Sequence, residues 1–284
     1  MPKFKSQISP SAGLRLIGIF LIVLFILWIV YIYFFKRPVE HFDTNQSLDG
    51  IDIVYWINLD RSKDRKDWME QLFQESVFQN TLNKRISAVD GKKQGLIDSM
   101  LDIPEKQDGH TDVVYACLLS HLNAIKELAI SDYDVALIVE DDVCLDFQKY
   151  WKKSIGEVII NAPNDWDIIQ LYYWVDNDFL KEEYTLNSDK KYNYTAVAYL
   201  INKSAAKKLI NKIYKNDKYT LNMNYPHSAD NYIYFELKSY VYKYPYFVHK
   251  TENDSTLHQE HVDEIHTPAK NRAIQVFENE IILK

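Results

Sequence analysis

The chain has 284 residues, of which 47% are apolar, a composition that suits one folded domain with an appendage and excludes a wholly disordered chain. Its formal net charge of −7 argues against a nucleic-acid partner, since proteins that bind nucleic acids carry clusters of basic residues. The two cysteines, Cys117 and Cys144, are too few for a disulfide framework and do not show the spacing of a metal-binding motif.

The first predicted element is an uncharged apolar run at residues 16–35. A bilayer core of about 30 Å needs about 20 such residues in a helix, so this run is long enough to span a membrane. A cleaved signal peptide is the main alternative, but the run is too long for one and no small-residue cleavage site follows. A buried core helix is a weaker alternative. We therefore expect a signal anchor at 16–35, between a short tail at 1–15 and a polar stem at 36–50.

The charges that flank this run predict its orientation. Basic residues precede it at Lys3, Lys5 and Arg15 and follow it at Lys36 and Arg37. The small excess before the run favours a single-pass membrane protein with a cytoplasmic N-terminus and with the bulk of the chain lumenal or external. Four sequons agree with that side, although such triplets also arise by chance: Asn45, Asn193, Asn202 and Asn253.

The remainder, residues 51–284, reads as one domain in which strands alternate with helices. Apolar runs predict buried strands at 51–57, 135–139, 167–171 and 196–201. Helical periodicity predicts helices at 62–73, 114–128 and 204–214, with Ser62 and Ser204 as the N-caps of the first and the last. This alternation predicts an α/β fold with a doubly wound, mostly parallel sheet. The polar stretches at 88–112 and 176–192 are expected to form loops or small lids.

Polar side chains follow three of the predicted strands. They are Asn58, Asp60, Arg61 and Arg65 after the first strand, Glu140, Asp141 and Asp142 after the second, and Gln170 at the end of the third. Ligands of doubly wound sheets bind beyond the carboxyl ends of the strands. We therefore expect these side chains to converge on one crevice.

The acidic triplet Glu140, Asp141 and Asp142 is the strongest chemical signal. Three adjacent carboxylates repel one another unless a cation compensates them. Alternate residues of an extended chain point to the same face, so Glu140 and Asp142 can share one ligand. Carboxylate oxygens suit Mn or Mg, either of which also bridges a diphosphate. A solvated turn after an edge strand is the alternative, but the buried strand that precedes the triplet favours a functional role.

Seven blocks of the sequence resemble glycosyltransferase family 25, the lipopolysaccharide and procollagen galactosyltransferase-like family. They are residues 54–61 with Asp64 and Arg65, 85–91, 116–121, 136–143, 165–167, 198–201 and 229–231. Ala116 stands where the family usually has glycine. The resemblance covers about residues 51–260, and the order and spacing of the blocks make it specific. The segment 253–258 resembles virus-encoded relatives.

This resemblance implies a GT-A-like fold and an inverting transfer from a nucleotide-sugar donor. It implies a donor site formed by Asn58, Asp60, Arg61, Arg65, Asp90, Gly91, Ser120, His121, Asp141 and Gln170. It assigns the metal to Asp142 and Glu140, completed by a histidine near the C-terminus, for which His249, His258 and His261 are candidates. It makes Asp230 the candidate base that takes the proton from the acceptor hydroxyl.

Structural roles stay open for several of these residues. Arg65 can instead pair with Asp60 or Asp64 on the helix surface. His121 can be a hydrogen-bonded core histidine, and the pair at 90–91 can be a simple turn. Asp230 can be a helix N-cap, which does not exclude a catalytic role.

The leading functional hypothesis is a membrane-anchored glycosyltransferase that moves a hexose, with UDP-hexose as the expected donor, to a glycan or glycoprotein hydroxyl. The main alternative is an inactive relative that binds glycans or partners at a cell or virion surface. A metal-dependent hydrolase is a weaker third possibility, because no matching His/Asp ligand set is found.

Overall fold

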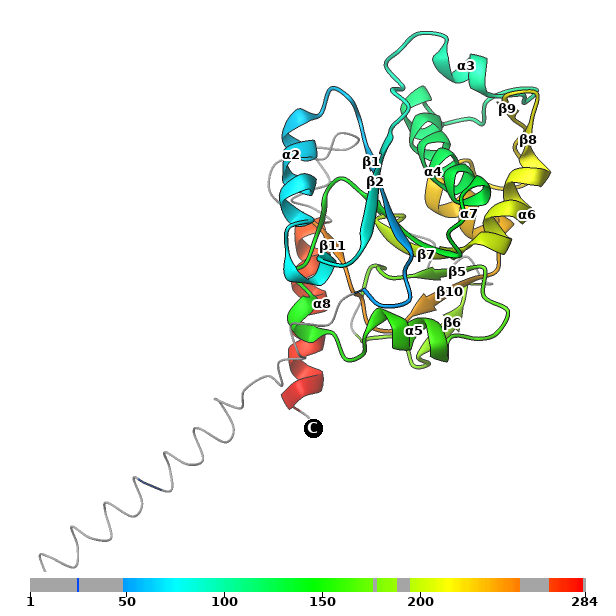
Figure 1. Cartoon of the computed structure of the whole chain (residues 1–284). Helices are drawn as coiled ribbons and strands as arrows, with labels where there is room; N and C mark the ends of the chain where they lie inside the picture. The colour runs from blue at the N-terminus through cyan, green and yellow to red at the C-terminus, as the bar shows by residue number, and fades with distance from the viewer. Residues whose placement is uncertain (1–24, 26–47, 176–177, 188–194, 251–265, 283–284) are drawn as a thin grey trace, which may run out of the picture. The chain divides into compact units, whose positions relative to one another are not determined.

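The computed structural model describes residues 25, 48–175, 178–187, 195–250 and 266–282 (Figure 1). The predicted tail at 1–15 and, apart from Phe25, the predicted anchor at 16–35 lie outside these residues, as does nearly all of the stem. The chain divides into two compact units, one of residues 1–41 with 280–284 and the other of residues 42–279. The second unit carries the predicted site and is described below.

A seven-stranded sheet organises residues 42–279. Its strands, in spatial order, are β2 (Leu82–Ser87), β1 (Ile53–Asn58), β3 (Val135–Glu140), β7 (Ala198–Asn202), β5 (Ile168–Gln170), β10 (Ser239–Tyr242) and β6 (Tyr184–Leu186). β1 pairs in parallel with β2 and β3, and β5 with β10. β7 is antiparallel to both of its neighbours, and β6 is antiparallel to β10. The expected mostly parallel α/β sheet is therefore confirmed, with β7 as a reversed strand in its middle.

The helices and the minor strands complete this unit. The helices are α2 (Lys63–Leu72), α3 (Leu96–Met100), α4 (Asp112–Ile130), α5 (Ile155–Asn161), α6 (Lys203–Ile213), α7 (Ala229–Glu236) and α8 (Thr267–Ile282), with single 3₁₀ turns at Ser76–Phe78 and Gln148–Tyr150. Two small antiparallel ribbons pair β4 (Val143–Cys144) with β11 (Val248–His249) and β8 (Tyr214–Lys215) with β9 (Lys218–Tyr219). The predicted stretch 88–112 is thus a loop that contains the short α3.

The buried strand β1 shows why the apolar runs became central strands. Ile53, Tyr55 and Ile57 face one core, which also contains the buried sides of α4, α6 and α7. Trp56 points to the other face, where its ring packs against Phe73 just after α2, with ring centroids 5.8 Å apart. Figure 1 shows α4, α6 and α7 together on one side of β1 and β2, and α2 on the other. Both faces of β1 are therefore covered, as expected for a parallel strand.

The helix α4 is the only described helix that is long and apolar enough to cross a membrane. More than half of its most apolar window is buried within the fold. Eleven of its residues are buried, and among them are Leu118, Leu122 and Ile125. This helix is therefore the central core helix of the unit.

The N-cap of α6 corrects one local prediction. The cap is Asn202, whose Oδ1 accepts a hydrogen bond from the backbone N–H of Ala205 at 2.8 Å, and not Ser204. The Asn202 Nδ2 also donates to the backbone oxygen of Trp166 at 2.6 Å. This side chain, which is part of a predicted sequon, is used inside the protein. The other three sequons, at 45, 193 and 253, lie outside the described residues.

Candidate functional site

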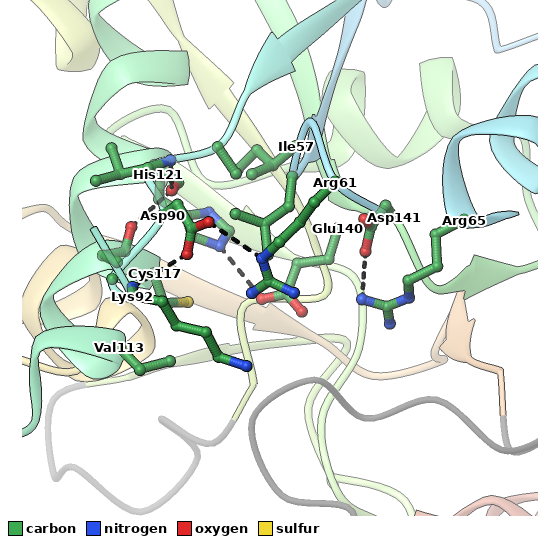
Figure 2. Close-up of a pocket in the computed structure, with 16 residues that line it drawn as sticks. Ile57, Arg61, Arg65, Asp90, Lys92, Val113, Cys117, His121, Glu140 and Asp141 are labelled. Atoms are coloured by element: carbon green, nitrogen blue, oxygen red, sulfur yellow. Dashed lines mark hydrogen bonds and ion pairs between the residues drawn. The ribbon is translucent and has the colours of Figure 1, made fainter. Parts of the chain in front are cut away.

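A pocket opens at the carboxyl ends of β1 and β3, beside the N-terminal half of α4 (Figure 2). It encloses about 660 Å³ of space, part of which is open to solvent. Eight of the predicted site residues line it: Arg61, Arg65, Asp90, Gly91, Ser120, His121, Glu140 and Asp141. Asn58, Asp60, Asp142, Gln170 and Asp230 are absent from its lining. The predicted convergence of β1 and β3 on one crevice is therefore confirmed, while β5 contributes no lining residue.

Asn58, at the end of β1, connects the two strand ends. Its Nδ2 donates to Asp141 Oδ2 at 2.6 Å, and its Oδ1 accepts from Arg85 Nε at 2.8 Å. Because its side chain is buried and bonded at both ends, Asn58 positions Asp141 and does not reach into the pocket. Asp60 is exposed and accepts hydrogen bonds from Arg85 at 2.8 Å and Ser87 at 2.9 Å.

Arg65 on α2 reaches the acidic triplet. Its NH1 lies 2.6 Å from Asp141 Oδ1, and its NH2 lies 2.7 Å from Asp142 Oδ2. The alternative of a surface pair with Asp60 or Asp64 is therefore wrong. Helix α2 follows β1 closely in the chain, and the fold brings its guanidinium to Asp142, 77 residues further along, and to the neighbouring Asp141. One guanidinium thus compensates two of the three carboxylates.

The three carboxylates differ in their proton affinities. Burial raises the pKa of Asp142 to about 7, against the opposing charge of Arg65 and with added repulsion from Glu140 and Asp141. Burial also raises the pKa of Asp141. For Glu140 burial is opposed by the hydrogen bond and charge of His121 and by the charge of Arg65, and its pKa is lowered. The triplet therefore carries unbalanced negative charge when it is fully ionised, which favours a cation.

Two buried polar atoms, one in the triplet and one close to it, have no hydrogen-bond partner among the described residues. They are Asp142 Oδ1 and His249 Nε2. The ribbon of β4 and β11 pairs His249 with Val143, and Lys250 N donates to Asp142 O at 2.6 Å. Burial and neighbouring His266 lower the pKa of His249 to about 4, so its ring is the neutral form that metals bind. By their chemistry, the carboxylates of Glu140 and Asp142 and the neutral imidazole of His249 are ligands that a divalent cation accepts. His258 and His261 lie outside the described residues.

Asp90 and Gly91 form the wall opposite the triplet. Asp90 forms an ion pair with Arg61 at 3.1 Å and accepts a hydrogen bond from Lys92 N at 3.0 Å. The hydrogen bond from Lys92 N and the interaction with Arg61 lower the pKa of Asp90. A side chain at Gly91 would lie 2.6 Å from the backbone oxygen of Asp112, so only glycine allows this loop to pack on the start of α4. The turn at 90–91 is therefore real and also lines the pocket.

Ser120 and His121 project from α4 below this loop. The Ser120 hydroxyl donates to Ala116 O at 2.6 Å and accepts from Val89 N at 2.9 Å, which fastens the loop to the helix. His121 is buried, with Nδ1 3.1 Å from the Tyr199 hydroxyl and Nε2 3.2 Å from Glu140 Oε1. His121 is therefore a hydrogen-bonded core histidine that also faces the pocket.

The family model of glycosyltransferase family 25 (LPS biosynthesis protein) matches residues 51–225, which include the pocket and the triplet. The chain belongs to glycosyltransferase family 25. It is 27% identical over 196 residues to a glycosyltransferase 25 family member of Aedes aegypti, a match that covers 62% of the chain and 31% of the relative. It is 28% identical over 177 residues to human procollagen galactosyltransferase 2, a match that covers 57% and 28% of the two chains. The chain thus spans about a third or less of the length of these relatives.

Asp230 lies beyond the segment that matches the family 25 model, in the first turn of α7. Its carboxylate accepts hydrogen bonds from Thr195 N at 2.9 Å and Asn231 N at 2.8 Å. The N-cap position of α7 is Ser228, so the N-cap alternative for Asp230 is wrong. Thr195 has a φ of +90°, which is rare for a β-branched residue and marks local strain.

Gln170 holds the same strained residue from the other side. It is fully buried, and its Nε2 donates to Tyr172 O at 2.8 Å and Thr195 O at 3.3 Å. Tyr234, on α7, donates to the same Thr195 oxygen at 3.1 Å. Gln170 therefore supports the backbone that orients Asp230, although it was predicted to contact the donor.

Cys117 is a pocket residue of this family 25 chain that the sequence analysis did not select. Burial and the nearby charges of Glu140, Asp230 and Asp142 raise the pKa of the Cys117 thiol well above its ordinary value. The donor atoms of Cys117, His121 and Glu140 lie within 4.8 Å of one another. The spacing of Cys117 and His121, one helical turn apart, is the sequence signal that could have identified this cluster.

Proposed function

We propose that this chain is a membrane-anchored glycosyltransferase that transfers a hexose from UDP-hexose to a hydroxyl of a glycan or glycoprotein, with inversion. The observation that carries the proposal is the acidic triplet beside the pocket, with Asp142 Oδ1 and His249 Nε2 buried and unpartnered among the described residues. Membership of glycosyltransferase family 25 and the names of the two relatives support glycosyl transfer. The strand order with reversed β7 supports a GT-A-like fold.

Asp142, Glu140 and His249 would hold Mn or Mg. The bound cation supplies positive charge that offsets the charge developing on the diphosphate leaving group. The side chain of Arg61 is 44% exposed and forms an ion pair with Asp90. It would exchange this pair for the diphosphate oxygens when the donor binds. Asp141 is fixed by Asn58 and Arg65 and would accept a hydrogen bond from the ribose or the sugar.

Asp230 would accept the proton of the acceptor hydroxyl as the sugar arrives from the opposite face. Its two backbone hydrogen bonds, to Thr195 and Asn231, fix the direction of the carboxylate. The strained Thr195 and its buried support from Gln170 explain how the fold holds this position. In this view the donor binds on the triplet side and the acceptor on the α7 side.

The decisive experiment measures release of free nucleotide from a panel of nucleotide-sugars by the purified full-length chain, with and without Mn. We expect release from a UDP-hexose that Mn stimulates, and a further increase when a glycan acceptor is added. His249→Gln should weaken Mn binding, measured from the EPR signal of free Mn, whereas His110→Gln, at a partly exposed histidine before α4, should not. Binding of nucleotide-sugar without any turnover would favour the inactive, glycan-binding relative.

We also propose that residues 16–35 are retained as the anchor, with the catalytic unit lumenal or external. The length of the apolar run without a cleavage site supports this proposal. Mass spectrometry of the mature N-terminus tests it, with an intact first segment as the expected result. A mature chain that starts near residue 38 would refute the anchor.

A further inference from the structure

Cys117, His121 and Glu140 bring three different donor atoms together at the inner wall of the pocket (Figure 2). Sulfur, nitrogen and oxygen of these side chains lie within 4.8 Å of one another. Cys117 and His121 are four residues apart on α4, so their side chains lie one above the other on the same face. Glu140 faces them from the carboxyl end of β3.

The backbone that carries these side chains is rigid. α4 is the core helix of the unit, and β3 lies between β1 and β7 in the middle of the sheet. His121 Nε2 is already 3.2 Å from Glu140 Oε1. Ligand atoms around a tetrahedral zinc are about 3.5 Å apart, since zinc–ligand bonds are about 2.0–2.3 Å long. Only small side-chain adjustments are therefore needed to close the cluster around an ion.

The second ring nitrogen of His121 has the kind of partner that orients metal-binding histidines. Nδ1 lies 3.1 Å from the hydroxyl of Tyr199, a fully buried residue of β7 whose ring stacks on the imidazole. Metal-binding histidines usually donate their other N–H to such a partner, which fixes the tautomer and the ring direction. In the metal-free chain Nε2–H donates to Glu140. When an ion takes the place of that hydrogen bond, the ring proton can reside on Nδ1, directed to Tyr199, and the Nε2 lone pair then faces the ion.

We propose that Cys117, His121 and Glu140 form a site for a thiophilic divalent cation, Zn²⁺, with a fourth coordination position that faces the pocket. Thiolate, imidazole and carboxylate are the ligands that zinc takes in proteins, whereas Mn and Mg favour oxygen donors. When the Zn–S bond forms, the thiol proton of Cys117 passes to solvent, so binding releases one proton.

Glu140 belongs both to this site and to the proposed Mn site. A zinc ion on Cys117 and His121 would draw Glu140 away from Asp142, so we expect Zn²⁺ to inhibit Mn-dependent transfer. This consequence rests on the proposed function, but the binding of zinc does not. A direct binding measurement therefore separates a failure of this inference from a failure of the proposed function.

The test is a titration of the metal-free full-length chain with Co²⁺, a spectroscopic substitute for zinc. We expect thiolate-to-cobalt charge-transfer absorption that added Zn²⁺ abolishes. Cys117→Ala should remove this absorption, and Cys144→Ala, at the other free cysteine, should retain it. Absence of the absorption in the unmodified chain, or its persistence in Cys117→Ala, would overturn the proposal.

Two further measurements guard against variants that fail to fold. Alkylation of Cys117 in the unmodified chain, followed by peptide mass spectrometry, should slow at least about tenfold with Zn²⁺ but not with Mg²⁺; equal rates would contradict the site. Tyr199→Phe should weaken zinc affinity by about 10–100-fold, the usual effect of losing an outer hydrogen-bond partner of a metal ligand. An unchanged zinc affinity in a folded Tyr199→Phe chain would show that Tyr199 does not orient His121.

Discussion

The carboxylates that follow β3 and the carboxylate of Asp230 on α7 are held by different kinds of partner. Asp141 and Asp142 share the guanidinium of Arg65. Asp230 accepts hydrogen bonds from N–H groups of Thr195 and Asn231, and within the described part of the chain no ion pair reaches it. The first arrangement gathers negative charge around a place for a cation, while the second fixes the direction of one carboxylate without a counter-ion. This difference is what we would expect if the triplet has the proposed metal-binding role and Asp230 the proposed proton-accepting role.

Replacing Asp142 should have the largest effect. Asp142→Ala is expected to abolish Mn-dependent turnover, because it removes the buried carboxylate oxygen that has no partner among the described residues. Nucleotide release with and without Mn measures this, and circular dichroism checks that the fold is retained. Asp132→Ala, an exposed carboxylate close to β3, is the matched control. Wild-type activity of Asp142→Ala in Mn would show that the metal assignment is wrong.

Asp230→Asn should reduce kcat by about 10²–10⁴-fold, the usual contribution of a general base. Asparagine keeps the shape, but it cannot take the acceptor proton. Its single amide oxygen can also replace only one of the two oxygens of Asp230, which accept from Thr195 N and Asn231 N, so a circular dichroism spectrum must show that the variant is folded. Donor affinity should barely change, since the role is confined to the transition state. Steady-state kinetics with a saturating acceptor tests this. Near-normal transfer by the folded variant would reject Asp230 as the base.

Arg65→Ala tests whether the triplet depends on a counter-ion. Removing one partner of a buried ion pair typically costs about 3–5 kcal/mol, and we expect the low end because the Asp142 side chain is 23% exposed. The loss should appear in urea unfolding of the metal-free chain. Mn should restore more stability to Arg65→Ala than to the unmodified chain, because the cation replaces the missing charge. Equal effects of Mn on both chains would argue against a shared place for guanidinium and cation.

The stability of the fold should depend on pH through His227, with a smaller effect than the substitutions above. His227, just before α7, is buried between the Tyr115 hydroxyl at 3.0 Å and the Asn222 backbone oxygen at 3.2 Å. Burial lowers its pKa below the ordinary value of 6.5, so the folded chain binds fewer protons than the unfolded chain just below that pH. Its contribution to stability is therefore complete above pH 6.5 and is lost as the pH falls through the folded pKa.

His227→Gln should flatten this part of the pH dependence. Glutamine can keep a hydrogen bond to Asn222 but has no proton to gain. Thermal unfolding of the variant and of the unmodified chain between neutral and mildly acidic pH measures the difference. An unchanged slope in His227→Gln would show that another group causes the acid sensitivity.

Local sequence patterns were enough to predict β1, β3, β5 and β7, the helices α2, α4 and α6, and the position of the triplet. These features follow from the pattern of apolar and polar residues within a short stretch of sequence. The same patterns did not predict β2 and β10, nor β6, which lies in a stretch that was expected to be a loop. The direction of β7 was not accessible in the same way, because an apolar run reads alike in parallel and antiparallel pairing. The structure places β7 antiparallel between β3 and β5.

Partner choice was decided by the tertiary structure. The sequence analysis predicted that Arg65 contacts the donor and left a pair with Asp60 or Asp64 as the alternative, yet the fold brings Asp141 and Asp142 to it. Many carboxylates are equivalent by residue type, and only strand register and helix packing bring one of them within hydrogen-bond distance.

The choice among the C-terminal histidines also separates what the sequence predicted from what only the folded structure decided. The sequence by itself determined that hard carboxylate ligands follow a buried strand, and it left His249, His258 and His261 as equal candidates to complete them. The pairing of β11 with β4 sets His249 beside Val143 and leaves its Nε2 buried without a partner among the described residues. Burial and pairing over about a hundred residues of intervening chain are properties of the folded state, so local pattern could not supply them.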